Sequence, residues 1–222
     1  GENAPCEVIP QPVLDMLKNI RTFVVEEVRT ARRYLSKAGL KGTIDTLAFH
    51  ELNEHTQQAE IEGYLKLFDN GNDVALISEA GLPAVADPGA DVVAIAQRKG
   101  LKVVPLVGPS SIILSVMASG FNGQSFAFNG YLPVKPDERI KALRKLEQRI
   151  YNEDQTQLFI ETPYRNGKMV EDILATCRPQ TKLCIAANLT CEGEYAKTRT
   201  VKEWKGKVPD LSKIPCIFLL YK

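Results

Sequence analysis

The residues best placed to do chemistry lie in a run of small residues at 78–89, Ser-Glu-Ala-Gly-Leu-Pro-Ala-Val-Ala-Asp-Pro-Gly. The run follows an apolar stretch and precedes one with helical character. Small side chains let a ligand approach the backbone closely, and Glu79 adds a carboxylate that could hold a polar group. Asp87 and Pro88 can cap the next helix. A long loop that only caps a helix would have the same composition, so both interpretations stay open.

Two further loops carry polar groups next to a predicted strand or helix. Gly108-Pro-Ser-Ser111 precedes an apolar helix, so its amides and hydroxyls could hold an anionic or polar ligand group, or simply cap the helix. In Glu161-Thr-Pro-Tyr-Arg165 a carboxylate and a guanidinium flank a proline, an arrangement that suits a reaction or a solvated ion pair. Taken singly, none of the three loops identifies a reaction.

Several common sites are missing from the sequence. It has no G-x-G-x-x-G fingerprint, no G-x-x-x-x-G-K-[ST] phosphate loop and no G-x-S-x-G. His50 and His55 stand five residues apart, whereas a helical zinc pair needs a spacing of four. The five cysteines form no C-x-x-C pair and match no zinc pattern, so we expect reduced, mostly buried thiols and no metal site.

The composition is that of an ordinary globular protein. Of 222 residues, 44% are hydrophobic and 25% charged, which excludes a disordered chain. The net charge of +1 excludes a simple polycation, but basic patches at 29–33 with Lys37 and Lys41, and at 135–149, could contact RNA. Acidic residues interleave the second patch, which favours a solvated helix face. No membrane-spanning run or leader is seen, so we expect a cytoplasmic protein.

The elements that position these loops alternate between short apolar runs and amphipathic stretches, which predicts an α/β protein. In the first half we predict strands at 22–26, 46–49, 73–78 and 102–106, and helices at 13–20, 29–38, 56–68 and 90–99. This alternation indicates a parallel sheet, and such sheets bind ligands beyond the carboxyl ends of their strands. The run at 78–89 lies at one of those ends.

The second half mixes hairpin-like and crossover connections. We predict strands at 125–129, 157–161, 182–187, 198–201 and 216–221, and helices at 112–118, 137–150 and 165–176. Because the connections differ from those of the first half, we expect two α/β domains, 1–110 and 111–222. The chain opens in a proline-rich loop at 1–12, so we also expect that a first strand lies upstream of this numbering.

In order and spacing, these segments resemble the tetrapyrrole methylase superfamily. The nearest branch is the bacterial one that methylates a cytidine 2′-hydroxyl in small-subunit ribosomal RNA. The resemblance spans essentially the whole chain and rests on 78–89, 104–111, 118–120, 128–133 and 158–165, with further support from 26–33 and 49–54. Its most specific part is 76–133. It also places Gly1 in a Pro-x-Gly-Asn turn that follows a first strand.

The resemblance implies S-adenosylmethionine (SAM) in the cleft between the two domains, and usually a homodimer. By family position, the cofactor-binding residues are Ser78, Glu79, Ala80, Gly81, Val85, Ala86, Ser110, Ser111, Leu189 and Pro215. Methyl transfer from SAM is an in-line displacement, which needs alignment and exclusion of water but no metal.

A ribose hydroxyl is a poor nucleophile, so charged groups should assist its reaction. We predict Glu26, Arg29, Glu161 and Arg165 as the catalytic set. The carboxylates would orient or deprotonate the hydroxyl, and the arginines would hold phosphate. For each of the four, an ordinary ion pair between elements is the alternative.

Departures from the family pattern leave the methyl acceptor open. Glu79 stands where the family has Asp, Ala187 and Asn188 replace an Arg-Glu pair of the ribosomal RNA branch, and Ile214 and Pro215 replace Gly-Glu. Loss of a charged pair affects RNA specificity more than SAM binding, which relies on backbone and shape. The alternatives are a methyltransferase for a small molecule such as a tetrapyrrole, and a catalytically silent binding protein that keeps the fold.

Overall fold

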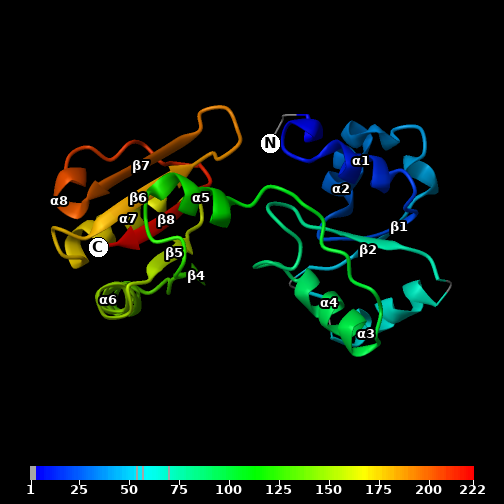
Figure 1. Ribbon diagram of the computed structural model, residues 1–222, viewed down its shortest axis with the longest axis horizontal. Helices are drawn as coiled ribbons and strands as arrows, with labels where there is room; N and C mark the ends of the chain where they lie inside the picture. Colours follow the sequence, from blue (N-terminus) through cyan, green and yellow to red (C-terminus); the bar gives the residue numbers. More distant parts are fainter. Residues whose placement is uncertain (1–3, 54, 57, 70) are drawn as a thin grey trace. The chain divides into compact units, whose positions relative to one another are not determined.

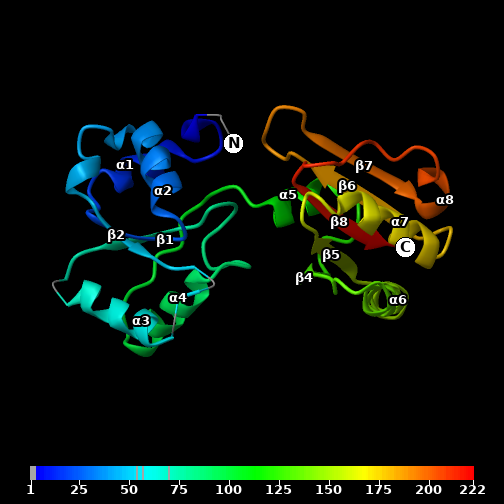
Figure 2. The ribbon, with the colours of Figure 1, turned by 180° about the vertical axis from the view of Figure 1, so that it is seen from behind.

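The computed structural model describes residues 4–53, 55–56, 58–69 and 71–222. The chain divides into two compact units, Gly1–Ser110 and Ser111–Lys222 (Figure 1, Figure 2). That the two units act as separate domains stays a prediction. The predicted opening of the chain and the helix at 56–68 fall in part on residues 1–3 and 57, which lie outside the described residues.

The first unit is built on a parallel sheet of three strands in the order β2-β1-β3. The strands are β1 (Thr22–Val25), β2 (Ala48–Glu51) and β3 (Val74–Ile77). Strand β1 pairs with both neighbours, so its apolar side chains from Phe23 to Val25 are buried. A central parallel strand is covered on both faces and therefore reads as a continuous apolar run.

Helices cover both faces of this sheet (Figure 1). Helices α1 (Gln11–Leu17) and α2 (Val28–Leu35) pack with Phe23 and Val25, while α3 (Gln58–Gly63) and α4 (Gly89–Arg98) pack with Val24. Because successive strand side chains point to opposite faces, one strand serves both cores. The short turns are η1 (Pro5–Glu7), η2 (Ser36–Leu40), η3 (Ile44–Thr46) and η4 (Tyr64–Phe68).

The strand predicted at 102–106 is wrong. Within the described residues, 101–110 form neither strand nor helix, and β3 pairs only with β1. Val104 and Val107 are consequently 54% and 73% exposed. A β-rich composition yields a strand only where a neighbour supplies backbone hydrogen bonds, and this segment has no such neighbour in the described part of the chain.

The second unit carries a mixed sheet of five strands in the order β4-β5-β8-β6-β7. These are β4 (Phe126–Tyr131), β5 (Thr156–Ile160), β6 (Lys182–Ala187), β7 (Tyr195–Thr200) and β8 (Cys216–Tyr221). Strands β4 and β5 are parallel, and β8 runs antiparallel to β5 and β6. The carboxyl ends of β4, β5 and β6 therefore share one edge with the start of β8.

Each face of the second sheet has its own apolar core. Helix α5 (Ser111–Ser119) packs on the face that includes Leu158 and Leu219. Helices α6 (Pro136–Glu153), α7 (Asn166–Thr176) and α8 (Val201–Trp204) cover the face that includes Phe159 and Phe218. These strand side chains are almost wholly inaccessible to solvent.

Helix α8 replaces the end of the strand predicted at 198–201. Strand β7 begins three residues earlier, at Tyr195, and Thr200 caps the helix: its side-chain oxygen accepts from the Glu203 amide, while the Glu203 carboxylate accepts from the Thr200 amide. Thr200-Val-Lys-Glu203 has the capping-box spacing, a signal that could have predicted this helix.

The five cysteines are all free thiols, and Cys177, Cys184 and Cys216 are buried. Burial raises the pKa of Cys177 and of Cys216 to about 12, so these two thiols are inert at neutral pH. Across the described residues, every helix is too short or too polar to cross a membrane.

Candidate functional site

The loop between β3 and α4, residues 78–88 and here named the β3–α4 loop, is tied to the ends of β1 and α2. The backbone amide of Glu79 donates to Glu26 Oε1 at 2.9 Å. The Thr30 hydroxyl, in the first turn of α2, donates to the Glu79 carboxylate. Since Glu26 directly follows β1, the parallel sheet brings together two residues that are 53 positions apart in the sequence.

Inside the loop, Asp87 holds the backbone in one conformation. Its Oδ1 accepts from the amides of Ala84 and Gly89, at 2.9 and 2.8 Å. Ala84 and Ala86 have positive φ angles of 64° and 54°, a region that is strained for alanine. A Cβ on Gly89 would lie 2.5 Å from Leu76 Cδ2 and 2.6 Å from Asp87 Oδ1, so a larger residue where the loop enters α4 would displace these two side chains.

The loop presents small groups to solvent. Ser78 is half-buried and its hydroxyl donates to the Gly81 carbonyl at 3.3 Å. Among the predicted cofactor contacts in this loop, the exposed residues are Glu79, Ala80, Gly81, Val85 and Ala86. A ligand can therefore reach the backbone of this loop directly, with Val85 as its exposed apolar contact.

The environment of Glu26 is acidic. Burial raises the pKa of the Glu26 carboxyl above its usual range, and contact with the Asp87 carboxyl and the charge of Glu79 raise it further, against the opposing effect of the Glu79 amide. The next residue behaves in the opposite way, because the Arg29 and Thr30 amides that Glu27 caps lower its pKa. Glu26 therefore retains its proton to a higher pH than Glu27 does.

Arg29 lies in the exposed first turn of α2. Its guanidinium makes no hydrogen bond or ion pair with any residue that the structure describes. An exposed guanidinium without a hydrogen-bond partner in the described residues suits an anionic ligand group such as a phosphate.

In the second unit, Glu161 and Arg165 form an ion pair within one loop. Glu161 follows β5, and its side chain is only 2% exposed. Its Oε1 accepts from the Thr162 amide at 2.6 Å and from Arg165 Nε and Nη2 at 3.0 and 2.7 Å. The Arg165 side chain stays 38% exposed, so part of the guanidinium faces solvent. An ion pair is therefore present, with a buried carboxylate rather than a solvated one, and a catalytic role for the two residues stays a prediction.

Asn166, which the sequence did not single out, organises the neighbouring loop. It is fully buried, and its Nδ2 donates to the carbonyls of Ile214 and Leu211 at 2.7 and 3.3 Å. Its Oδ1 is buried without a hydrogen-bond partner among the described residues. The Lys213 amide donates to the Pro163 carbonyl, so the loop before β8 lies against the loop after β5.

The predicted contacts Leu189 and Pro215 lie at this same edge. The Asn188 amide donates to the Pro215 carbonyl at 3.1 Å, and Asn188 itself has a positive φ of 49°. Leu189 packs on the core that also holds Ile112, in the first turn of α5.

The two predicted serines at the start of α5 differ in exposure. Ser111, the first residue of α5, is exposed, whereas Ser110 is 8% exposed. The Ser111 hydroxyl is therefore open to a ligand, while the Ser110 side chain is largely enclosed by protein.

The predicted site residues thus form two groups. One group is Glu26, Arg29 and the β3–α4 loop in the first unit, and the other is Ser111, Glu161, Arg165, Leu189 and Pro215 in the second. A single cofactor cleft stays a prediction. Within the described residues, no three His, Cys, Asp or Glu side chains gather as a metal site.

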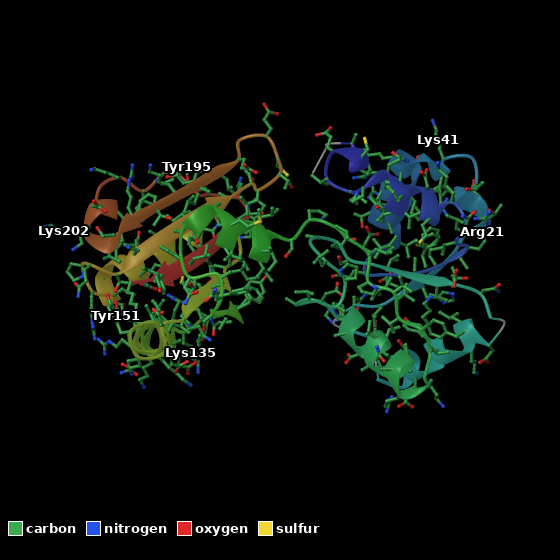
Figure 3. All side chains as sticks on the ribbon, viewed as in Figure 1. Arg21, Lys41, Lys135, Tyr151, Tyr195 and Lys202 are labelled. Atoms are coloured by element: carbon green, nitrogen blue, oxygen red, sulfur yellow. The ribbon has the colours of Figure 1, made fainter. Side chains whose placement is uncertain are left out.

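Several cations of the basic segments are paired with carboxylates. Lys41 and Lys135 project into solvent (Figure 3), and Lys135 pairs with Glu138 at 3.4 Å. Arg139 is buried instead, bound to Asp172 at 2.7 Å through its Nε. Helix α6 is therefore in part a structural element rather than an open basic surface.

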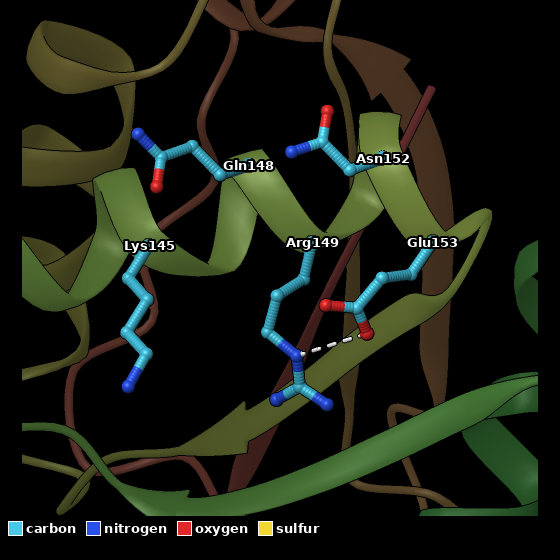
Figure 4. A pocket seen from close by; sticks show the side chains of 5 residues that line it. All are labelled: Lys145, Gln148, Arg149, Asn152 and Glu153. Carbon is cyan, nitrogen blue, oxygen red and sulfur yellow. Dashed lines mark hydrogen bonds and ion pairs between the residues drawn. The ribbon is translucent and has the colours of Figure 1, made fainter.

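A surface hollow of about 410 Å³ lies along α6 (Figure 4). Its lining residues are Lys145, Gln148, Arg149, Asn152 and Glu153. Arg149 Nε pairs with Glu153 Oε2 at 3.4 Å across it. All of the lining comes from one helix, away from the strand ends that carry the predicted residues, so we assign the candidate site to the loops.

No family model matches the chain. Among curated proteins, ribosomal RNA small subunit methyltransferase I of Haemophilus influenzae is 30% identical over 208 residues, which cover 92% of this chain and 70% of that protein. The protein of the same name from Neisseria meningitidis is 33% identical over 190 residues, covering 86% and 62%. The chain therefore spans less than two thirds of the Neisseria protein.

Solved structures share the fold at low sequence identity. The methyltransferase CobJ matches with a TM-score of 0.65 at 14% identity, over 97% of this chain and 89% of that one. Uroporphyrin-III C-methyl transferase from Thermus thermophilus, complexed with S-adenyl homocysteine, matches with a TM-score of 0.58 at 18% identity, over 99% and 93%. This likeness confirms the predicted α/β fold class.

Proposed function

Because the chain belongs to the ribosomal RNA small subunit methyltransferase I family, within the tetrapyrrole methylase superfamily, we propose that it is a SAM-dependent methyltransferase. Its proposed acceptor is a ribose 2′-hydroxyl in small-subunit ribosomal RNA. The observation that carries the proposal is the β3–α4 loop, whose exposed small residues are anchored by Glu26 at one end and Asp87 at the other.

The residues present fit the cofactor. SAM carries a sulfonium and an ammonium cation, and the carboxylates beside the loop, above all exposed Glu79, match that charge. Val85 adds an apolar contact, and the exposed backbone supplies donors and acceptors. When bound, SAM would supply a methyl group activated by its sulfonium. The proposed contacts are Ser78, Glu79, Ala80, Gly81, Val85, Ala86, Ser110, Ser111, Leu189 and Pro215.

For the reaction itself we assign roles to the four predicted catalytic residues. Arg165 keeps an exposed part of its guanidinium and would hold an RNA phosphate, with Arg29 as a second cation. Glu161 would act through Arg165, because its Oε1 already accepts three donors. Glu26 is the carboxyl that contacts the loop and would orient the ribose hydroxyl, because its raised pKa does not suit a base that receives the hydroxyl proton.

A tetrapyrrole acceptor is the alternative, and two observations favour it. One solved structure of similar fold is named as a uroporphyrin-III C-methyl transferase. Ala187, where the ribosomal RNA branch has a charged residue, is 3% exposed and adds no charge to the edge. We also propose that the protein is a homodimer and that it is cytoplasmic. Sedimentation of the purified protein would test the dimer.

Calorimetric titration of the whole chain with SAM and with S-adenosylhomocysteine tests the enzyme proposal first. We expect micromolar binding of both ligands, an affinity ordinary for small-molecule sites, about −8 kcal/mol. If neither ligand binds, the enzyme proposal is contradicted, and the alternative of a catalytically silent binding protein is favoured. Transfer of a labelled methyl group then separates the acceptors: label in small-subunit ribosomal RNA supports the proposal, and label only in a tetrapyrrole overturns the RNA assignment.

A matched pair of variants connects that activity to the loops. Arg165→Ala removes the proposed phosphate contact, so methylation of RNA should fall at least tenfold while binding of S-adenosylhomocysteine is retained. Arg98→Ala changes an exposed arginine in the last turn of α4, outside both basic segments, and as the control it should leave both measurements unchanged. Equal effects of the two variants would contradict the role assigned to Arg165.

A further inference from the structure

Asp87 carries a carboxylate oxygen that no amide or hydroxyl satisfies. Its Oδ1 accepts from two loop amides, but its Oδ2 is buried and has no hydrogen-bond donor among the described residues. A buried acceptor left without a donor is costly, and more so when it is charged. A donor next to this oxygen would remove that cost.

The Glu26 carboxyl lies close to the Asp87 carboxyl. Glu26 uses Oε1 to accept from the Glu79 amide at 2.9 Å, and its carboxyl is near enough to that of Asp87 for the two to interact. An ionised carboxylate only accepts hydrogen bonds, so two of them in contact repel each other. The contact becomes favourable when one of the two carboxyls carries a proton and donates it to the other.

We propose that Asp87 is a positioning residue: with Glu26 it forms a carboxylic acid–carboxylate pair, bridged by one proton, that holds the β3–α4 loop in the conformation that receives the cofactor. This inference rests on the proposed function, because the loop is the proposed cofactor site. Asp87 is not one of the residues that the family resemblance assigned to SAM.

The strained backbone of the loop needs contacts that hold its conformation. Two of its alanines, Ala84 and Ala86, sit at positive φ, and strained conformations persist only where surrounding bonds over-determine them. Asp87 Oδ1 holds the amides on either side of that strained part, and Oδ2 joins it to the end of β1 through Glu26. The Glu26–Glu79 bond fastens the other end of the loop, so Glu26 serves both ends.

The surrounding charges keep a proton on the pair. Within the described residues, the charges that act on Glu26 are the Asp87 and Glu79 carboxyls of the β3–α4 loop, and the other charged side chains at this end of the sheet are Glu27 and Arg29 at the start of α2 and Glu51 at the end of β2. Arg29 acts on Glu27, and Glu51 accepts from the Asn53 amide group. No cation pairs with Glu26 in the described part of the chain, and the raised pKa of its carboxyl agrees with a retained proton.

Affinity for S-adenosylhomocysteine as a function of pH tests the pair. In the unaltered protein the affinity should fall as pH rises through the raised pKa of Glu26, because the bridging proton is then lost. Asp87→Asn keeps the side-chain oxygen for the two loop amides and gains an amide that donates to Glu26 at every pH. This variant should bind with the low-pH affinity of the unaltered protein throughout, with a flat profile.

Two further variants serve as the positive and the negative control for this measurement of affinity. Asp87→Ala removes both functions and should weaken binding about tenfold or more. Asp91→Asn makes the same chemical change at an exposed carboxylate in the first turn of α4 and should follow the unaltered protein. A pH profile of Asp87→Asn that parallels the unaltered protein would overturn the proposal, as would an Asp87→Ala variant that binds normally.

Hydrogen exchange of the β3–α4 loop separates this inference from the proposed function. Without any ligand, the loop amides of Asp87→Asn should exchange more slowly than those of the unaltered protein, and the difference should grow with pH. If that difference is seen but no protein binds SAM or its product, the pair stands and the enzyme proposal fails. If exchange is identical at every pH, the pair does not exist, whatever the binding data show.

Discussion

Glu26 and Glu161 occupy equivalent places in the two units, each being the first residue after a parallel strand, yet their surroundings are opposite. Glu161 is nearly inaccessible and accepts three donors, two of them from the Arg165 guanidinium. Glu26 accepts one backbone amide and faces the carboxyls of Asp87 and Glu79. The comparison teaches that position at a strand end brings a carboxyl to a ligand-binding edge, while its neighbours decide whether it is charged.

The two units also differ in how deeply the strands β8 and β3 are buried. In the second unit β8 lies in the middle of five strands and Cys216 to Leu220 are all buried. In the first unit β3 pairs on one side only, and all four of its residues are half-buried. Strand β8 is thus enclosed by a neighbour on each side, whereas β3 is an edge strand with a partner on one side only.

The largest expected effect comes from making the same substitution, leucine to alanine, in each of these two strands. Leu219→Ala in β8 should lower the free energy of unfolding by about 3 kcal/mol, because a fully buried leucine leaves a cavity. Leu76→Ala in half-buried β3 should cost only about 1 kcal/mol. Urea denaturation measures both, and equal losses would contradict the difference between the sheets.

The next effect separates the two glutamates. Glu161→Gln loses the charge on which Arg165 depends, so we expect a loss of about 1–3 kcal/mol of stability. Glu26→Gln should cost less than about 1 kcal/mol, because its amide can donate to Asp87 while its oxygen still accepts the Glu79 amide. Thermal unfolding of the two variants side by side decides this, and a larger loss for Glu26→Gln would contradict the proton-sharing pair.

The pH dependence of stability sharpens the same comparison. The folded pKa of Glu26 is raised, so its contribution to stability is complete below its unfolded pKa and is lost as pH rises through the folded pKa. Glu27 has a lowered pKa, so its contribution is present above its unfolded pKa and is lost as pH falls. Stability measured against pH should therefore show a decrease above mildly acidic pH that Glu26→Gln abolishes and Glu27→Gln does not.

The smallest effect concerns the hollow on α6. Arg149→Ala opens its pair with Glu153, an exposed interaction worth less than about 1 kcal/mol. We expect stability and S-adenosylhomocysteine affinity to change little, since the site is assigned to the loops. A tenfold loss of affinity in calorimetry would move the cofactor site from the loops to this helix.

The order of the strands along the chain and their α/β alternation could be predicted because apolar periodicity is a local property. The strand at 102–106 could not, since Val104 and its neighbours have strand-like composition but no backbone partner in the described residues. Helix α8 was missed although Thr200 and Glu203 carry the capping pattern, because the preceding strand propensity continues into it. Local patterns therefore predicted the elements better than their ends.

The sequence by itself determined the α/β class, the loops that carry polar and small residues, and the resemblance that led to the family. It could not show that Asp87, first interpreted as a helix cap, meets Glu26, or that buried Asn166 holds the loop before Pro215. These contacts join residues 61 and 48 positions apart, and only the pairing of strands brings such residues together. Residue type and spacing state which groups are available, whereas burial and neighbours, which tertiary structure alone decides, determine their charge and their partners.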